Sequence, residues 1–278
     1  MNVVTLEASV IVPTRDAAGV LPATIASIGD DPTLEILIID CGSDGTADWV
    51  TRAADQRLRW LPGPGRGAHA ARNLGIAEAE APLIAFLDAG QCWVPGKLAL
   101  QLALHRRQPE IGFSFGAHGA RAAGDPPEGG ARVLASDALP RIFAAAPIEA
   151  STVVARTALL RAVGGFTEDA GAAADWDLWL HLSQCAPVGW LPRPLAQGPA
   201  GPQDGRRMAS ARRVAEVWRH PVAAIDPAAA REGLARVLAA SAEAALAEGD
   251  HFAALCFRLA RLRLRSARAI GALFGGMG

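Results

Sequence analysis

The sequence predicts an α/β domain with a mainly parallel central sheet flanked by helices, followed by a C-terminal α-helical extension. In the first third of the chain, short apolar runs alternate with segments of helical composition, which is typical of a parallel sheet covered on both faces. From about Pro227 this alternation gives way to alanine-rich helical sequence. We therefore expect the α/β domain at residues 1–200 and the extension, a helical hairpin, at residues 201–278.

The expected strands of the first third are short and almost wholly apolar. They are Ala8–Pro13, Leu34–Asp40, Pro82–Asp88 and the less regular Arg57–Leu61. The helical segments between them are Gly19–Ile28, Ala47–Ala54 and Gly67–Ala79. Ligands of such sheets bind at the carboxyl ends of the strands, so the polar residues that follow each strand are the first candidates for a site.

The middle of the chain is less regular. We expect strands at Gly112–Gly116 and Ser151–Ala155 and a helix at Asp175–Gln184. Ala117–Gly130 and Pro192–Gly205 are rich in glycine and proline, which favours loops, the first of them mobile. Further on, Ala229–Ala247 predicts a helix. Gly249 and Asp250 then supply a stop and a new N-cap, which completes the hairpin.

Composition excludes several classes of protein. The chain has 278 residues, of which 51% are hydrophobic and 20% charged, so one large or two small globular domains are expected. A net charge of −1 argues against nucleic acid as the main partner. The first residues carry Glu7 and lack a basic segment, unlike a signal peptide, and no run of about 18 apolar residues occurs. The four cysteines form no C-x-x-C pair, which favours reduced thiols in a cytoplasmic protein.

Five motifs follow one another in a characteristic order. They are VIVPTRD (Val10–Asp16), IIDCGSDGT (Ile38–Thr46), ARNLGIAEAEAPLIAFLDAG (Ala71–Gly90), VGGFTED (Val163–Asp169) and ADWDLWLHL (Ala174–Leu182). Together, over roughly residues 8 to 195, they resemble the family 2 glycosyltransferases. The resemblance implies a GT-A fold, which is Rossmann-like, and a nucleotide-sugar donor.

The implied activity is inverting transfer of a hexose from a nucleotide-diphosphate-sugar to an acceptor hydroxyl, in polysaccharide or glycoconjugate biosynthesis. The acceptor, a saccharide, a lipid-linked sugar or a protein, stays open. The residues that match the family's donor site are Pro13, Thr14, Arg15, Asp16, Asp40, Cys41, Ser43, Arg72, Asn73, Asp88 and Ala89. Around the first two strands, the local residues also fit ordinary turns in which Ser43 or Asp44 caps the next helix.

Three of these positions raise specific questions. Arg15 stands where the family has an aromatic residue, and Cys41 where it often has an acid. A guanidinium at position 15 can stack on a base or contact a phosphate, so the identity of the base is open. Arg72 suits the diphosphate oxygens, the alternative being a surface arginine on a helix.

Asp88 matches the first acid of the family's D-x-D motif, which supplies oxygen ligands to Mg²⁺ or Mn²⁺. Gly90 replaces the second acid. Three consequences are open. The metal binds more weakly through Asp88, water and donor phosphates; Asp88 contacts only the ribose while arginines neutralise the diphosphate; or transfer activity is lost.

Asp175 matches the acid of the family's E-D motif, and Ala174 replaces the preceding glutamate. An inverting transfer needs a carboxylate that faces the acceptor hydroxyl, so Asp175 is the candidate catalytic base, with a helix N-cap as the alternative. Asp177 lies on a different helix face and is expected to be structural. Trp176 and Trp179 fit core packing better than a platform for sugar.

Two alternative functions remain. Gly90 and Ala174 favour a degenerate member that binds a nucleotide, a sugar or a partner protein without transfer. A nucleotidyltransferase is disfavoured because Lys97, the only lysine, lies outside any glycine-rich loop.

The last helix is locally basic, because no acid follows Asp250. A helical wheel gathers apolar side chains on one face, namely Phe252, Leu255, Cys256, Leu259 and Leu262. It gathers arginines opposite them, at positions 258, 261, 265 and 268. One interpretation is a helix packed on the catalytic domain with a solvated basic face. The other is a peripheral membrane contact, in which arginines meet anionic headgroups and Ile270–Phe274 dips in.

Overall fold

The computed structural model describes residues 5–119, 130–145, 148–199 and 204–274, with the side chains of 169 and 265–274 excepted. It divides into two compact units. The first comprises Met1–Ala138, Ile148–Glu168 and His181–Ala200, and the second comprises Leu139–Pro147, Asp169–Leu180 and Gly201–Gly278.

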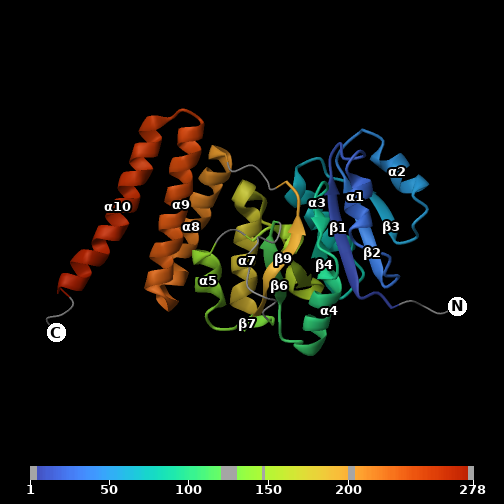
Figure 1. The fold of residues 1–278 in the computed structure, drawn as a ribbon, viewed down its shortest axis with the longest axis horizontal. Coiled ribbons are helices and arrows are strands. Elements are labelled where there is room, and N and C mark those ends of the chain that lie inside the picture. The colour runs from blue at the N-terminus through green and yellow to red at the C-terminus, as the bar shows by residue number, and fades with distance from the viewer. Residues whose placement is uncertain (1–4, 120–129, 146–147, 200–203, 275–278) are drawn as a thin grey trace. The chain divides into compact units, whose positions relative to one another are not determined.

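The first unit is built on a mixed sheet, which in the described residues has nine strands (Figure 1). They are β1 (Ala8–Thr14), β2 (Leu34–Asp40), β3 (Leu58–Pro62), β4 (Leu83–Phe86), β5 (Cys92–Trp93), β6 (Phe113–His118), β7 (Arg132–Leu134), β8 (Val154–Arg156) and β9 (Val188–Gln197). The order is β3-β2-β1-β4-β8-β6-β9-β5, with β7 paired to β9. The ladders β3-β2-β1-β4 and β6-β9 are parallel, and the pairings of β5, β7 and β8 are antiparallel.

Alternation along β1 decides which helices cover which face of the sheet. Val10 and Val12 share one apolar cluster with side chains from α1 (Leu21–Ala26), α2 (Thr46–Arg52) and α4 (Lys97–Arg107). Ile11 points to the other face and meets α3 (Ala68–Glu78), where a side chain on Gly75 would come within 2.6 Å of it. Helices therefore cover both faces of the sheet, as the apolar strands predicted.

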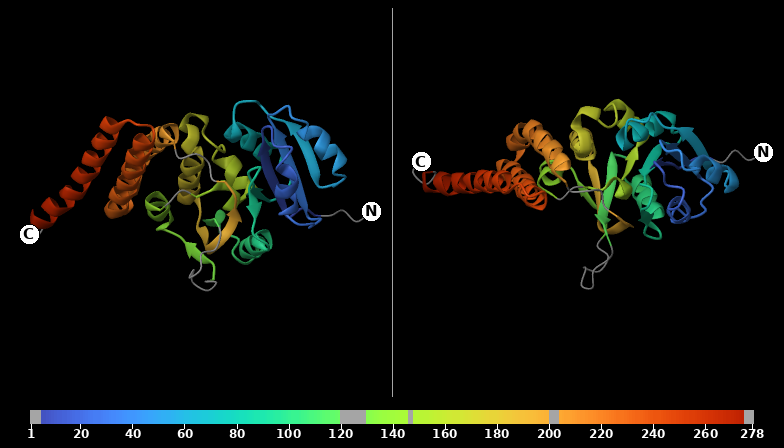
Figure 2. Two further views of the ribbon diagram at one scale, coloured as in Figure 1. Left: turned by 45° about the horizontal axis from the view of Figure 1, so that its top comes forward. Right: turned by 90° about the horizontal axis from the view of Figure 1, so that it is seen from above.

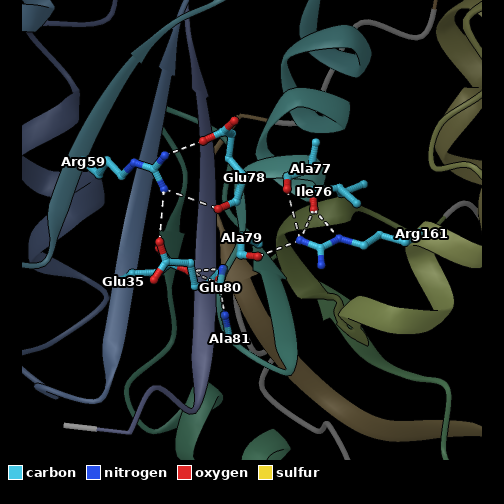
Figure 3. Close-up of polar contacts among 10 residues, drawn as sticks. Glu35, Arg59, Ile76, Ala77, Glu78, Ala79, Glu80, Ala81 and Arg161 are labelled. Carbon is cyan, nitrogen blue, oxygen red and sulfur yellow. Dashed lines mark hydrogen bonds and ion pairs between the residues drawn. The ribbon is translucent and has the colours of Figure 1, made fainter. Parts of the chain in front are cut away.

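The turn between α3 and β4 is fixed by charged side chains (Figure 3). Arg161, from α6 (Thr157–Ala162), donates to the carbonyls of Ile76, Ala77 and Ala79 at 2.6–3.1 Å. These carbonyls end α3 and have no partner within the helix, so the guanidinium satisfies them. Arg59 of β3 pairs with Glu78. This clamp fixes the C-terminal end of α3, the helix that carries Arg72.

The second unit is helical. Its long helices α8 (Gly205–Ile225), α9 (Pro227–Ala247) and α10 (His251–Phe274) lie side by side in both views of Figure 2. Asp226 ends α8 and begins α9, its carboxylate accepting the amides of Ala228 and Ala229 at 2.8 and 3.0 Å. Three shorter elements cross the boundary between the units, namely α5 (Ala138–Ala144), the 3₁₀ segment η2 (Glu168–Ala173) and α7 (Ala174–Cys185). The 3₁₀ segment η1 (Ala150–Thr152) belongs to the first unit.

Helical structure begins earlier than the sequence suggested. It starts at Gly205 rather than near Pro227, because α8 accommodates Pro221 within its length. The expected loop at Pro192–Gly205 is strand β9 as far as Gln197, although β9 contains two prolines. The expected loop at Ala117–Gly130 lies mostly outside the described residues, and its first two residues extend β6. Within the part of the chain that the structure describes, no helix is both long and apolar enough to cross a bilayer.

Candidate active site

The carboxyl ends of β1 and β2 are locked together by Asp40. Thr14 lies opposite Asp40 in the ladder, and its hydroxyl donates to Asp40 Oδ1 at 3.0 Å. The amide of Gly42 donates to the same oxygen at 3.0 Å, and Trp60 Nε1 lies 3.4 Å from Oδ2. Asp40 is buried, so it organises the strand ends. Its contacts leave it less available to a ligand than the residues that follow the strands.

The residues that follow β1 and β2 form an exposed rim, which consists of Arg15, Asp16 and Ser43. Asp16 has a φ of 51°, and its Oδ1 accepts the amide of Ser43 at 3.1 Å. Arg15 donates to the carbonyl of Gly65 at 3.2 Å and is exposed. The rim is tightly joined, since a side chain on Gly42 would come within 2.4 Å of the Asp16 amide. Arg15, Asp16 and Ser43 are thus brought together at one edge of the sheet.

Of Ser43 and Asp44, it is Asp44 that bonds the first residue of α2, although the N-cap residue itself is Gly45. Asp44 Oδ1 accepts both the amide and the hydroxyl of Thr46, at 3.2 and 2.6 Å, and its Oδ2 accepts the amide of Ala18 at 2.7 Å. The Thr46 hydroxyl is the main reason that the pKa of Asp44 lies below its usual value. Asp44 therefore holds the start of α2, which leaves the side chain of its neighbour Ser43 exposed at the rim.

Arg72 is not a surface arginine, because only 5% of it is exposed. From the middle of α3 its Nη2 donates to Asp88 Oδ1, and its Nη1 lies 3.2 Å from His69 Nδ1. Its guanidinium lies 5.5 Å from the centre of the Phe166 ring, on which His69 also stacks. The arginine therefore orients Asp88, and two of its nitrogens are already engaged.

Asn73 holds the glycine-rich VGGFTED segment against α3. Its Nδ2 donates to the carbonyl of Phe166 at 2.9 Å, and its Oδ1 accepts the amide of Phe166 at 2.8 Å. This close contact between Asn73 and Phe166 requires glycine at the preceding position, 165. Gly165 has a φ of 72°, and a Cβ atom there would lie 2.4 Å from Asn73 Oδ1. Asn73 thus positions Phe166, and through it the Arg72 guanidinium.

The backbone around Asp88 is anchored from two directions. Its amide donates to Ser151 Oγ at 2.9 Å, and the carbonyl of Ser151 accepts Trp93 Nε1 at 2.9 Å. The amide of Gly90 donates to Thr24 Oγ1 at 3.0 Å. Sequence reasoning did not find Ser151 or Trp93, because neither belongs to a motif whose spacing marks a site. Ala89 follows Asp88 in the same half-buried turn.

The residues present offer little to a metal ion on their own. Asp88 Oδ1 is engaged by Arg72, and the side chain is 31% exposed, so one carboxylate oxygen is available. Among the described residues, no group of three or more His, Cys, Asp and Glu side chains is placed to bind a metal. Asp88 therefore fits a divalent ion as a single ligand, with the remaining positions left to phosphate oxygens and water.

Asp175 lies in the second unit, in the first turn of α7. It is buried, its Oδ1 accepts the amide of Trp176 at 2.9 Å, and Arg207 Nη2 lies 3.5 Å from its Oδ2. A hydrogen bond from the next backbone amide and an ion pair therefore meet at one carboxylate, and Asp175 is the second residue of α7 and not its N-cap. Arg207, from the first turn of α8, was not found from the sequence, since it lies just after the predicted loop Pro192–Gly205, in a segment for which no element was predicted.

The neighbours of Asp175 are structural, as expected. Asp177 is buried and accepts Trp218 Nε1 at 2.8 Å. Trp176 is buried and stacks on Phe143 at 5.4 Å between ring centroids. Trp179 is completely buried. Both tryptophans of the motif belong to the core and are not available as a sugar platform.

Comparison with known families decides what kind of domain carries this geometry. Residues 9–131 match the model of glycosyl transferase family 2. Over these residues the chain is similar to the family 2 glycosyltransferases. The match confirms the resemblance noted in the sequence and contains the first three of the five motifs.

The alignments with curated relatives cover only part of each relative. A glycosyltransferase of Rickettsia conorii is 27% identical over 194 residues, which cover 68% of this chain and 32% of the relative. The Escherichia coli UDP-Glc:alpha-D-GlcNAc-diphosphoundecaprenol beta-1,3-glucosyltransferase WfgD is 31% identical over 112 residues, covering 39% of this chain and 44% of the relative. The aligned part of this chain thus spans less than half the length of each relative.

Solved structures confirm the GT-A fold. Residues 1–349 of Staphylococcus aureus TarS, in complex with UDP, superpose with a TM-score of 0.63 at 17% identity, covering 95% of this chain and 92% of that one. Mannosyltransferase PcManGT from Pyrobaculum calidifontis, in complex with GDP-Man and Mn²⁺, gives a TM-score of 0.58 at 20% identity, with coverage of 98% and 88%. At these identities the likeness establishes the fold.

Proposed function

We propose that the protein transfers a sugar from a nucleotide-diphosphate-sugar donor to an acceptor hydroxyl with inversion at the anomeric carbon. The observation that carries the proposal is the carboxyl edge of β1, β2 and β4, where the exposed rim of Arg15, Asp16 and Ser43 shares a sheet edge with the arginine-held Asp88. Ligands of open α/β sheets bind at this edge. UDP and GDP-Man in the two structural neighbours support a nucleotide-sugar as that ligand.

Within this proposal the rim residues, together with the half-buried Cys41, contact the nucleoside, and Asp88 faces the diphosphate. Arg15 supplies an exposed positive charge for a base or phosphate. Arg72 acts through Asp88 as a positioning residue, because its own donors are directed to Asp88 and His69. The expected direct contact of Arg72 with the diphosphate is therefore replaced by an indirect one.

Asp175 is the proposed catalytic base. Its carboxylate accepts the hydroxyl proton of the acceptor while the acceptor oxygen forms a bond to the anomeric carbon. The bond from that carbon to the donor phosphate breaks at the same time, and the nucleoside diphosphate leaves with the electron pair. Attack from the face opposite the leaving group inverts the configuration. Arg207 holds one carboxylate oxygen and so fixes its orientation.

A divalent ion, Mg²⁺ or Mn²⁺, would neutralise charge on the leaving diphosphate when bound. In this chain Asp88 is its proposed single carboxylate ligand, so donor binding is expected to depend only weakly on metal. The Mn²⁺ in the mannosyltransferase structure supports a role for such an ion.

Introducing the missing acid tests this metal assignment. Gly90→Asp should strengthen Mn²⁺ binding about tenfold in the presence of nucleoside diphosphate, since a second carboxylate joins the site. Gly90 has a φ of 89° and only Val20 within 4 Å of an added side chain, so the cost is backbone strain of about 1 kcal/mol. Gly90→Asn carries the same strain without the charge and is the matched control. Calorimetric titration measures both. Tight Mn²⁺ binding by the wild type that survives Asp88→Ala would contradict the assignment.

A non-catalytic member of the same family is the second candidate, favoured by Gly90 and Ala174 at the two acidic motifs. A nucleotidyltransferase gains no support, because Lys97 is buried over the Trp93 ring and its burial lowers its pKa well below the usual value. The two candidates, sugar transfer and binding without transfer, are distinguished by measuring the release of nucleoside diphosphate from a panel of donors with saccharide and lipid-linked acceptors. Transfer predicts acceptor-dependent release and an inverted product by NMR, and a binder releases nothing.

A further inference from the structure

The last helix, α10, exposes its apolar face, which one of the two interpretations of the helical wheel placed against the catalytic domain. Phe252, Leu255 and Leu259, here called the apolar stripe, are 78%, 53% and 49% exposed. The face turned to α9 and α8 carries Ala254, which is buried, and Phe257, over whose ring Arg212 of α8 lies at 4.5 Å. The apolar residues thus form a continuous exposed surface over two turns of the helix.

Arginines flank this stripe on both sides. Successive residues of a helix are 100° apart, which places Arg258 on one side of the stripe and Arg263 on the other. Both are exposed, and Arg258 also lies 3.6 Å from the exposed Glu243 of α9. No Asp or Glu occurs in the sequence after Asp250. The surface is therefore apolar along its centre and cationic along its edges.

The charge pattern discriminates between possible occupants. If two copies paired through the stripe, the flanking arginines of one helix would lie against those of the other in either orientation, and like charges would oppose each other. An anionic surface with an apolar interior complements both features at once. An amphipathic helix of this kind lies in the headgroup plane, with its apolar residues inserted and its arginines beside anionic phosphates.

We propose that the apolar stripe of α10, with Arg258 and Arg263, is a docking surface for an anionic lipid bilayer. The face that inserts is Phe252, Leu255 and Leu259, and Arg261 is excluded from the contact because it is turned toward the helical unit and only partly exposed. The earlier suggestion that Ile270–Phe274 inserts concerns side chains outside the described ones. The inference does not depend on the transfer reaction.

Flotation with vesicles of phosphatidylcholine and phosphatidylglycerol tests the proposal with the full chain. The wild type should float with these vesicles at low salt, float less as salt rises, and float weakly with phosphatidylcholine alone. Leu255→Gln/Leu259→Gln should reduce partitioning about tenfold or more, because two inserted side chains lose their apolar burial. Arg258→Gln/Arg263→Gln should reduce it roughly tenfold on anionic vesicles only.

The matched control is Val217→Gln/Ile225→Gln, which removes two exposed apolar residues of α8 and should leave flotation unchanged. Circular dichroism melting verifies that each variant is folded. A wild type that stays unbound at low salt overturns the proposal. The proposal is also overturned if the stripe variant floats as well as the wild type. A third contradicting result is a wild type that does not bind vesicles but sediments as a dimer, when the stripe variant sediments as a monomer. Donor binding, measured separately, is expected to be unchanged in all three variants.

Discussion

Asp175→Asn should lower kcat for sugar transfer by about 10²–10⁴-fold while leaving the donor dissociation constant within about twofold of the wild type. An amide cannot accept the acceptor proton, but it keeps the size of the carboxylate. It also keeps an oxygen for the Trp176 amide, so the first turn of α7 is preserved. The loss should therefore appear in kcat and not in donor binding. Steady-state transfer rates and calorimetric donor titration measure the two quantities.

Asp177→Asn is the matched control for this variant. It lies on the same helix, is similarly buried, and can keep its bond to Trp218 through the amide oxygen. We expect its kcat to stay near that of the wild type. If Asp175→Asn retains more than about a tenth of wild-type kcat, or if the two variants lose activity equally, Asp175 is not the base.

Asp88→Ala should destabilise the protein more than Arg72→Met does, although each variant breaks the same ion pair. Arg72 is 5% exposed, so removing Asp88 leaves a buried positive charge without its carboxylate partner. Asp88 is partly exposed, so water can hydrate its carboxylate when Arg72 is removed. We expect losses of about 2–3 kcal/mol and about 1 kcal/mol, reduced from the fully buried case because Asp88 faces solvent. The double variant should recover part of the loss of Asp88→Ala.

Urea denaturation of the four proteins measures this cycle. Equal losses in the two single variants, or a double variant less stable than Asp88→Ala, would mean that Arg72 is not a buried charge held by Asp88. Asp88→Ala should also weaken donor binding, whereas Arg72→Met should affect it less, since Arg72 acts through Asp88.

The sequence was most informative where one physical pattern dominates. Apolar runs of five to seven residues located β1, β2 and β4, because strands covered on both faces have few alternatives. The order of the motifs also located the sheet edge. The role of Arg72 was not predictable from its spacing, because its burial depends on Phe166, which is 94 residues away in the sequence and brought near by Asn73.

Other features depend on packing that one sequence does not reveal. Ser151 and Trp93 act on the backbone of Asp88 through bonds between distant segments. Arg207 reaches Asp175 from α8, a helix that the sequence did not predict and that contains Pro221. For α10, the interpretation in which the apolar residues of the helical wheel pack on the catalytic domain is wrong, because Ala254 and Phe257 face the neighbouring helices and Phe252, Leu255 and Leu259 are exposed.

Thermal unfolding in the presence of UDP-, GDP-, dTDP- and CDP-sugars, each with and without Mn²⁺, tests the central claim most directly. A donor present at about 100 times its dissociation constant should stabilise the fold by about 2.7 kcal/mol. We predict that donors of one base stabilise the wild type and Asp175→Asn alike, with a small further effect of Mn²⁺. If none of the four nucleotide-sugars shifts the unfolding transition of the wild type under either condition, the assignment of a nucleotide-sugar site to this sheet edge is wrong.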